Sequence, residues 1–244
     1  MRIVALDGHT LNPGDNPWAP VEALGEFVVY DKTPDELVVE RALGFDVVLT
    51  NKVSLTADIF DQLPDLKFVS FTATGYNVVD VEAARARSIP VSNIPVYGTD
   101  SVAQYTLALL LELCHNVGHH DLRVHEGGWQ DSGYWSFWDT PLTELAGKTL
   151  GLVGFGRIGQ RVGQLAHAFG MEVWAYAPSP KEDPGYAPFS FKSVEEIFAG
   201  ADVVSLHCPQ TASNAGFVNA ELLSSMKEEA LFINTARGGL VDEA

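Results

Sequence analysis

Short apolar runs alternate with amphipathic stretches over the first hundred residues. The apolar runs predict strands at residues 2–6, 27–30, 46–50, 66–71 and 90–92. Helical spacing of apolar side chains falls between them, near residues 34–42, 56–62 and 81–87. Strands that alternate with helices indicate a parallel sheet with helices on both faces.

A long helix is expected to begin at Gly98-Thr99-Asp100-Ser101, and we place a domain boundary before it, at residue 98. Ser101 with Gln104 fits a capping box, although Thr99 or Asp100 could also cap the helix. His119 and His120 are expected at the end of this helix, as surface or interface residues.

Residues 127–145 follow without a clear period and are rich in tryptophan, tyrosine and phenylalanine. A long irregular stretch of this kind is usually functional or part of an interface. The alternative is a loop packed on its own domain.

Further strands are expected at residues 148–153, 172–176, 202–206 and 230–233, with helices at 194–199 and 220–226. The fold class is therefore α/β, with two doubly wound parallel-sheet domains. Residues 1–97 form the first domain and residues 98–244 the second. Residues 241–244 are expected to start another helix.

A glycine pattern, Gly154-Phe155-Gly156-Arg157-Ile158-Gly159, joins the strand at 148–153 to a helix. In this context G-x-G-x-x-G is a dinucleotide-binding fingerprint. Gly154 allows the tight turn, Gly156 lets the backbone approach a pyrophosphate, and Gly159 lets the helix pack near the strand. The helix N-terminus then offers free N–H groups to the phosphates. The alternative is an ordinary glycine-rich turn.

Charge narrows the range of partners. The net charge is −17, from 15 basic and 32 acidic residues among 244. This balance argues against a nucleic-acid partner and against an anionic membrane surface. Two cysteines without framework spacing suggest a reducing compartment. The longest apolar stretch, residues 102–114, contains Gln104 and Glu112 and cannot span a bilayer. We expect a cytoplasmic protein.

Five motifs together resemble the D-2-hydroxyacid dehydrogenase family, in particular its glycerate dehydrogenase (hydroxypyruvate reductase) branch. They are Ala-Thr-Gly-Tyr-Asn-Val-Val-Asp at 73–80, Tyr-Gly-Thr-Asp-Ser-Val-Ala-Gln at 97–104, the glycine fingerprint, His-Cys-Pro-Gln-Thr at 207–211 and Ile-Asn-Thr-Ala-Arg-Gly-Gly at 233–239. The resemblance implies a flavodoxin-like substrate-binding domain at 1–97 and a Rossmann dinucleotide-binding domain at 98–244, incomplete at its C-terminus. It implies NAD as cofactor, with NADP possible, and a 2-keto or 2-hydroxy acid as substrate.

The resemblance also assigns roles to residues. Arg237 matches the catalytic arginine, which binds the substrate carboxylate and polarises the keto oxygen; a lone arginine is otherwise commonly a surface ion pair. Thr74 and Gly75 match the loop whose N–H groups hold the substrate carboxylate, or form a plain strand-ending turn. The remaining matches are cofactor contacts: Thr99, which is equally a helix cap, the strand-end residues His207, Cys208 and Pro209, and Thr235 and Ala236.

Two departures from the family matter. Ala177 stands where an acidic residue commonly binds the ribose hydroxyls, so repulsion of a 2′-phosphate is missing, and Ser179 and Lys181 could receive one. We expect weak discrimination between NAD and NADP, with a slight lean to NAD. The family's general-acid histidine and its partner glutamate follow the catalytic arginine, whereas no histidine follows Arg237 here. We interpret the chain as a fragment with little activity.

Three functions are compatible with these residues. The first is an oxidoreductase whose complete form reduces hydroxypyruvate or a related 2-keto acid. The second is a catalytically inactive dinucleotide-binding scaffold that resembles the C-terminal-binding-protein corepressors. The third is a relative with another substrate, such as formate or phosphonate dehydrogenase. The resemblance further implies a homodimer built on the second domain, in which residues 127–145, with Trp135 or Trp138, reach the partner.

Overall fold

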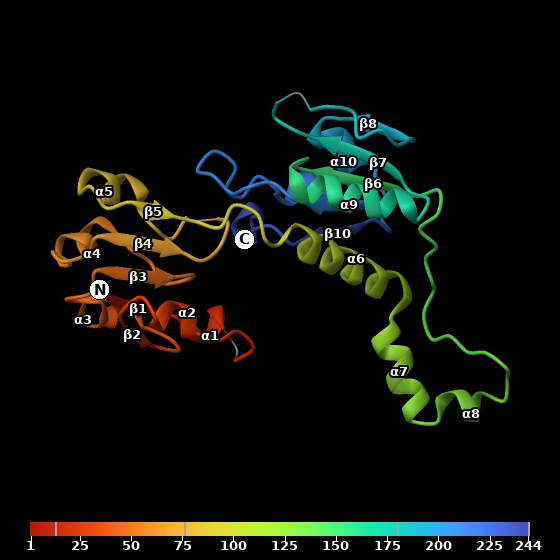
Figure 1. Ribbon diagram of the computed structural model, residues 1–244. Coiled ribbons are helices and arrows are strands. Elements are labelled where there is room, and N and C mark those ends of the chain that lie inside the picture. Colours follow the sequence, from red (N-terminus) through yellow and green to blue (C-terminus); the bar gives the residue numbers. More distant parts are fainter. Residues whose placement is uncertain (13, 76, 180, 244) are drawn as a thin grey trace. The chain divides into compact units, whose positions relative to one another are not determined.

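The computed structural model describes residues 1–12, 14–75, 77–179 and 181–243. The chain divides into two compact units, Met1–Tyr97 and Gly98–Ala244 (Figure 1). Each unit is an α/β layered structure with its own sheet, which confirms the predicted fold class.

The first unit contains a five-stranded parallel sheet. Its strands are β1 (Arg2–Ala5), β2 (Glu26–Val29), β3 (Val47–Thr50), β4 (Phe68–Phe71) and β5 (Val91–Ser92). Between them lie α1 (Gly8–Leu11), α2 (Ala19–Glu22), the 3-10 turn η1 (Asp35–Leu37), α3 (Val38–Ala42), α4 (Ala57–Asp61) and α5 (Val81–Ala86). The spatial order β2-β1-β3-β4-β5 is that of flavodoxin-like folds.

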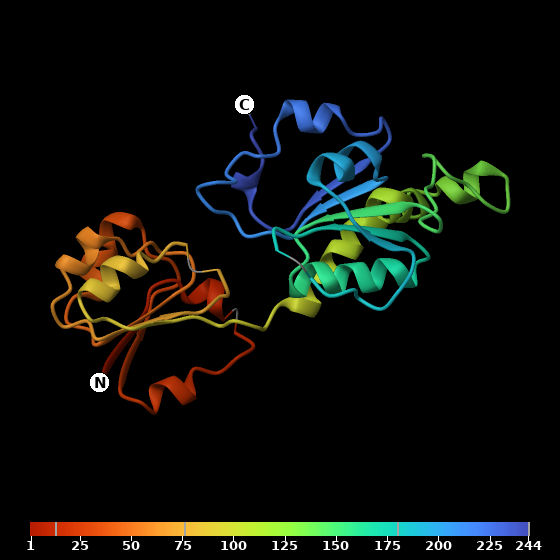
Figure 2. The ribbon, with the colours of Figure 1, turned by 90° about the horizontal axis from the view of Figure 1, so that it is seen from above.

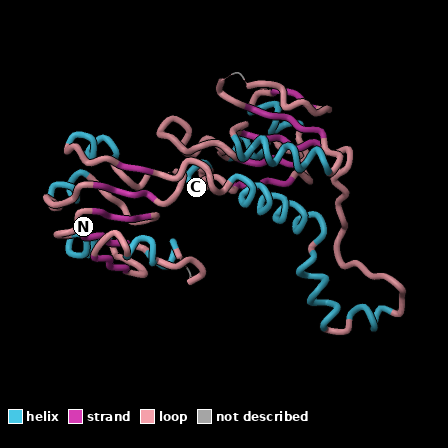
Figure 3. The backbone as a smooth tube through the Cα atoms, in the orientation of Figure 1, coloured by secondary structure: helices cyan, strands magenta, loops and turns pink. Residues whose placement is uncertain are grey.

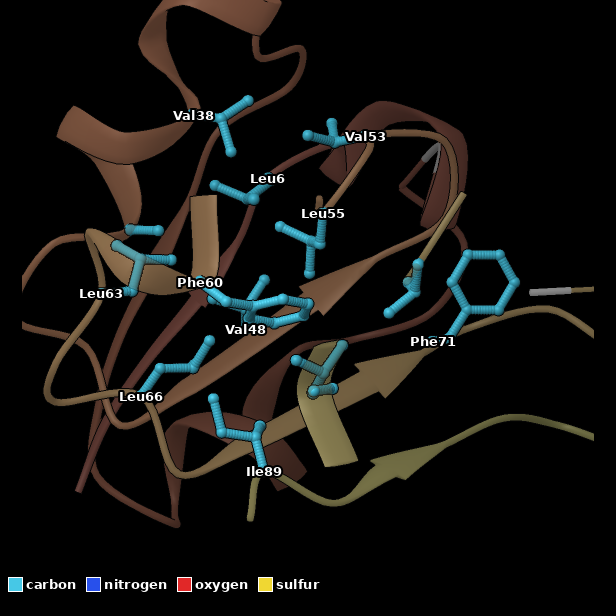
Figure 4. Packing of buried hydrophobic residues seen from close by; sticks show 14 of the residues in the cluster. Leu6, Val38, Val48, Val53, Leu55, Phe60, Leu63, Leu66, Phe71 and Ile89 are labelled. Carbon is cyan, nitrogen blue, oxygen red and sulfur yellow. The ribbon is translucent and has the colours of Figure 1, made fainter. Parts of the chain in front are cut away.

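One apolar cluster holds this unit together (Figure 4). Val48 and Phe71 come from neighbouring strands, and Val38 and Phe60 come from helices α3 and α4. All four are at most 2 % exposed. The helices are short, so burial of these side chains against the sheet, rather than helix propensity, stabilises them.

The second unit contains another five-stranded parallel sheet. Its strands are β6 (Thr149–Val153), β7 (Glu172–Tyr176), β8 (Phe189–Phe191), β9 (Val203–Leu206) and β10 (Leu231–Asn234). The helices are α6 (Thr99–His115), α7 (Val117–His125), α8 (Gly128–Ser132), α9 (Arg157–Ala168), α10 (Val194–Gly200) and α11 (Ala220–Ser224), followed by the 3-10 turn η2 (Gly238–Leu240).

The strand order β10-β9-β6-β7-β8 corresponds to the first five strands of the Rossmann order. Helices α6 and α9 cover one face of this sheet, and α10 and α11 cover the other (Figure 2). Strand β8, three residues with the sequence Phe-Ser-Phe, was not among the predicted strands.

The start of α6 differs from the prediction. The helix begins at Thr99 with Gly98 at the N-cap, and no side chain caps it, so the capping box at Ser101 and Gln104 is wrong. Asp100 instead forms an ion pair with Arg161 of α9, with 2.7 Å between Oδ1 and Nε. A complete capping box is present at Ser193 and Glu196, at the start of α10.

Residues 116–145 differ from the prediction in two ways. Asn116 adopts a left-handed conformation and ends α6, so His119 and His120 lie on a separate helix, α7, and not at the end of the long helix. Helix α8 occupies the start of the segment expected to be irregular, and a loop then leads back to β6 (Figure 3). We call residues 116–145 the arm.

The last described residues do not form the predicted helix. Val241 has an extended backbone and pairs with Val218 in an isolated bridge. Ala244 lies outside the described residues.

Candidate functional site

The glycine turn after β6 is closely packed at two of its three glycines. Gly154 has a φ of +108°, and a Cβ there would lie 2.6 Å from backbone atoms of His207 and Cys208. A Cβ on Gly159 would overlap the carbonyl oxygen of Gly154. Only glycine fits at either position, which holds α9 close to the ends of β6 and β9.

Gly156 is the opposite case. It forms the N-cap of α9 with extended backbone, and a Cβ there would meet no atom within 4 Å. No side chain caps the helix, and its first turn contains no acidic residue. The N–H groups and the partial positive charge of this helix start can therefore bind an anionic group such as a pyrophosphate.

The other fingerprint side chains divide between core and solvent. Phe155 is 1 % exposed, and its ring lies 5.2 Å from that of Phe189 between centroids. Ile158 is partly buried against the same core, whereas Arg157 is exposed. Phe155 can thus reach a ligand only through its backbone.

The neighbouring ends of β6 and β9 lie at the point where the strand order reverses, since β7 lies on the other side of β6. Doubly wound folds bind ligands at this point. His207 follows β9, and its Nε2 lies 2.9 Å from the Ser205 hydroxyl. Burial lowers the pKa of His207 to about 4 and raises the pKa of the partly buried Cys208 thiol. Pro209, next in the chain, is exposed.

No carboxylate follows β7 immediately. Ala177 is partly buried at the strand end, and Ser179 and Lys181 beyond it are exposed. Pro180, between them, lies outside the described residues.

The side chain of Asn234 closes the turn that carries Arg237. Its Nδ2 donates to the Arg237 carbonyl at 2.8 Å, and its Oδ1 accepts from the Ala236 N–H at 3.0 Å. Arg237 is exposed, and its Nη1 donates to the Ala236 carbonyl at 2.8 Å. Among the described residues no carboxylate pairs with it, so its charge is available to a ligand.

Thr235 connects this turn to α6. Its hydroxyl lies 3.0 Å from that of Thr106, which itself donates to the Val102 carbonyl at 2.8 Å. Because the Thr106 proton is used, the Thr235 hydroxyl donates to Thr106. Thr99 is the first residue of the same helix and is partly buried.

In the first unit, Thr74 and Gly75 follow β4 in a fixed loop. The Thr74 hydroxyl donates to the Ile94 carbonyl at 2.8 Å, and Asn93 donates to the Thr74 carbonyl at 2.8 Å. Neither the Thr74 nor the Gly75 N–H donates to another residue in the described ranges. Two backbone donors are thus free to bind an anion.

Sequence reasoning missed Asp7. It is 4 % exposed, and its carboxylate accepts from the N–H groups of Asn51, at 2.9 Å, and Lys52, at 2.5 Å. Asp7 therefore fixes the loop after β3, which adjoins β4 and its Thr74 loop. An aspartate directly after a strand was the available signal, but its partners are 44 and 45 residues away.

The histidines of the arm are engaged within it. His119 Nε2 and Arg123 Nε both lie 2.9 Å from Asp139 Oδ2. His120 Nδ1 lies 2.9 Å from the Asn116 carbonyl oxygen, and its Nε2 accepts from the Asp139 N–H at 3.4 Å. Both nitrogens of His120 are occupied, which makes it a poor candidate for a general acid.

Across the described ranges there is no group of His, Cys, Asp and Glu side chains that could hold a metal ion. Nor is any helix in this part of the chain both long enough and apolar enough to cross a membrane.

Residues 107–244 match the model of the D-isomer specific 2-hydroxyacid dehydrogenase NAD-binding domain. The chain is 46 % identical over 246 residues to hydroxypyruvate reductase of Blautia hydrogenotrophica, covering 100 % of this chain and 76 % of the relative. It is 38 % identical over 221 residues to glycerate dehydrogenase of Methylorubrum extorquens, covering 90 % of this chain and 68 % of the relative.

Solved structures of dehydrogenases and reductases are also similar to this chain. An acyclic imino acid reductase in complex with NADPH and D-Arg has a TM-score of 0.84 and 28 % identity, covering 100 % of this chain and 76 % of that chain. D-lactate dehydrogenase from Aquifex aeolicus, complexed with NAD and lactic acid, also has a TM-score of 0.84, with 27 % identity and coverage of 99 % and 71 %.

Proposed function

Because this chain belongs to the D-2-hydroxyacid dehydrogenase family, we propose that its substrate is hydroxypyruvate or a closely related 2-keto acid. The two relatives named above are called hydroxypyruvate reductase and glycerate dehydrogenase. These names describe the two directions of one reaction, between hydroxypyruvate and glycerate. The absence of framework spacing between Cys114 and Cys208 supports a cytoplasmic location.

The open start of α9 carries the proposal. Gly154 and Gly159 are required by the fold, whereas the space at Gly156 is empty although any residue could adopt its backbone conformation. Of the three glycines of the turn, only Gly156 has open space where a side chain would be, and it lies at an uncapped helix start. This arrangement fits a dinucleotide pyrophosphate. Arg157 and Ile158 would contribute N–H groups there. Ala177, His207, Cys208, Pro209, Thr235, Ala236 and Thr99 would line the rest of the cofactor site.

When bound, the nicotinamide supplies or accepts the hydride. Arg237 binds the substrate carboxylate and polarises the keto oxygen, for which its unpaired charge is suited. Thr74 and Gly75 bind the carboxylate through their free N–H groups. Asn234 is a positioning residue for Arg237.

These 244 residues do not include a histidine that matches the family's general acid. No histidine follows Arg237 in these 244 residues, and His120 is held by Asn116 and Asp139. General acid catalysis contributes about 10²- to 10⁴-fold, so we expect a polypeptide of these 244 residues alone to turn over slowly even when both ligands bind.

Two measurements test the proposal. Calorimetry with NADH and NADPH should show binding to the parent chain and a loss of at least about tenfold in Gly156→Val, with unchanged thermal stability. The matched control is Gly159→Ala, which should unfold more easily because its Cβ meets the Gly154 carbonyl. Equal affinity in Gly156→Val and the parent would contradict the proposed cofactor site.

The second measurement is turnover of hydroxypyruvate with NADH or NADPH by the purified chain. We expect a low rate that Arg237→Ala changes mainly through substrate binding. A rate typical of complete enzymes, about 10 s⁻¹, would show that another acid serves. Cofactor binding with no turnover of any 2-keto acid would favour the scaffold function.

We further propose a homodimer in which the arm contacts the partner subunit. Trp135 is 88 % exposed and Trp138 is 68 % exposed, and Leu122 and Val124 of α7, in the same arm, are also exposed. The contact of Asp139 with His119 and its ion pair with Arg123 hold the arm loop on α7. A pre-ordered aromatic surface of this kind is typical of permanent interfaces.

A further inference from the structure

A pocket of about 540 Å³ opens at the carboxyl end of β7. It begins at Ala177, the position where an acidic residue would bind the ribose hydroxyls. The polar residues that line it are Ser179, Lys181, Lys192, Ser193 and Glu196.

The pocket combines two cations with a single carboxylate, in a chain that has about twice as many acidic as basic residues. The Glu196 carboxylate already accepts the Ser193 N–H at 2.8 Å, in the capping box of α10. Its other oxygen lies 3.5 Å from Lys192 Nζ. Lys181 forms no ion pair with any residue of the described ranges.

Lys192 is held in place before any ligand arrives. Its Nζ lies 5.3 Å from the centroid of the Trp174 ring, in addition to its contact with Glu196. An ammonium fixed in this way loses little side-chain freedom when it binds an anion. Two of its three donors remain for a ligand.

We propose that this pocket binds the 2′-phosphate of NADP, and that the chain prefers NADPH to NADH. Lys181 and Lys192 neutralise the phosphate, and the Ser179 and Ser193 hydroxyls donate to it. This reverses the slight lean to NAD expected from the sequence. It rests on the proposed function, since the dinucleotide must first occupy the glycine turn.

The test compares the dissociation constants of NADPH and NADH by calorimetry in the parent, Lys181→Met and Lys192→Met. Methionine keeps the apolar stem and removes the charge. The parent should bind NADPH about tenfold more tightly, and each variant should lose about tenfold for NADPH but less than twofold for NADH. Lys227→Met is the matched control, because Lys227 pairs with Asp202 at the amino end of β9. It should change neither constant.

A smaller probe separates this pocket from the rest of the cofactor site. Adenosine 2′,5′-bisphosphate should compete with NADPH more strongly than adenosine 5′-monophosphate does, and the two lysine variants should remove the difference. Equal or tighter binding of NADH in the parent would overturn the inference while leaving the proposed function intact, and so would lysine variants that weaken both dinucleotides equally. Failure of both dinucleotides to bind would overturn both.

Discussion

His207 shows how its surroundings fix the charge of a side chain at the carboxyl end of β9. Its Nε2 lies 2.9 Å from the Ser205 hydroxyl, and burial lowers its pKa to about 4. In the unfolded chain a histidine has a pKa of about 6.5. Between these two values the unfolded chain binds more protons than the folded one. The contribution of His207 to stability is therefore complete above about pH 6.5 and is lost as the pH falls toward 4.

We expect His207→Gln to remove this dependence while keeping a hydrogen bond to Ser205. The loss attributable to His207 is at most about 3.5 kcal/mol, at about 1.4 kcal/mol for each pKa unit. Urea unfolding of both proteins at pH 7, 5.5 and 4.5 measures it. The parent should become less stable relative to the variant as the pH falls. Parallel curves would contradict the prediction, because carboxylates that titrate in this range affect both proteins equally.

Single residues differ in how far the sequence reveals them. The glycine spacing predicted a turn at Gly154 and a close helix contact at Gly159, because those demands are local. The roles of Asp7 and Asn234 could not be assigned from the sequence, although both fix loops at the carboxyl ends of strands. Their hydrogen-bond partners depend on strand order or on the path of a turn, and neither follows from spacing.

At the scale of elements, similar patterns had different outcomes. Ser193 and Glu196 form a capping box, whereas Ser101 and Gln104 do not, because α6 begins at Thr99 and places Ser101 inside the helix. The break between α6 and α7 also could not be predicted from the sequence. It depends on the left-handed backbone of Asn116, a conformation that asparagine tolerates but does not require.

The arm gives the prediction that belongs to this scale. Trp135→Ser and Trp138→Ser should each weaken the homodimer by at least about tenfold, since a buried aromatic side chain contributes about 1.5–3 kcal/mol. Sedimentation velocity across a concentration series measures the dissociation constant. Leu24→Ser is the control, because Leu24 is a 60 % exposed apolar residue of the first unit.

A parent chain that sediments as a monomer at micromolar concentration would rule out the permanent dimer. Weakening by the Leu24 variant, without an effect of either tryptophan, would place the interface elsewhere.

For the whole molecule, the excess of acidic residues sets the response to salt. A net charge of −17 makes the folded chain repel itself. The exposed ion pairs oppose this only weakly, because each is worth at most about 1 kcal/mol. The Debye screening length shortens from about 10 Å at 0.1 M salt to about 3 Å at 1 M. Salt should therefore weaken the long-range repulsion more than the short-range attraction within ion pairs.

We therefore expect the melting temperature to rise by several degrees between 0.05 and 1 M sodium chloride. The rise should level off as screening becomes complete, whereas preferential exclusion of salt would give a steady increase. Sucrose is the control for exclusion, because it is excluded from the protein surface but carries no charge. A melting temperature that falls with salt would show that the ion pairs outweigh the repulsion.

The α/β class and the alternation of strands and helices followed from the sequence, because apolar runs and helical periods are local signals. The strand orders did not follow from these local signals; only the family resemblance implied them, as a flavodoxin-like and a Rossmann order. In each sheet the chain starts near the middle and moves to one side before the other, and this choice depends on how helices pack on the completed sheet.

The hydroxyl contact between Thr106 and Thr235 has a consequence for how the chain becomes ordered during synthesis. It joins residues 129 positions apart, from the first helix of the second unit to the turn after β10. All strands of the first unit precede residue 98, so its contacts can form while the second unit is still being made. Helix α6, although made early, must wait first for α9 and finally for β10 before its inner face is fully covered. For that interval the ribosome-bound chain presents an apolar helix surface, the state in which a nascent chain depends most on chaperones.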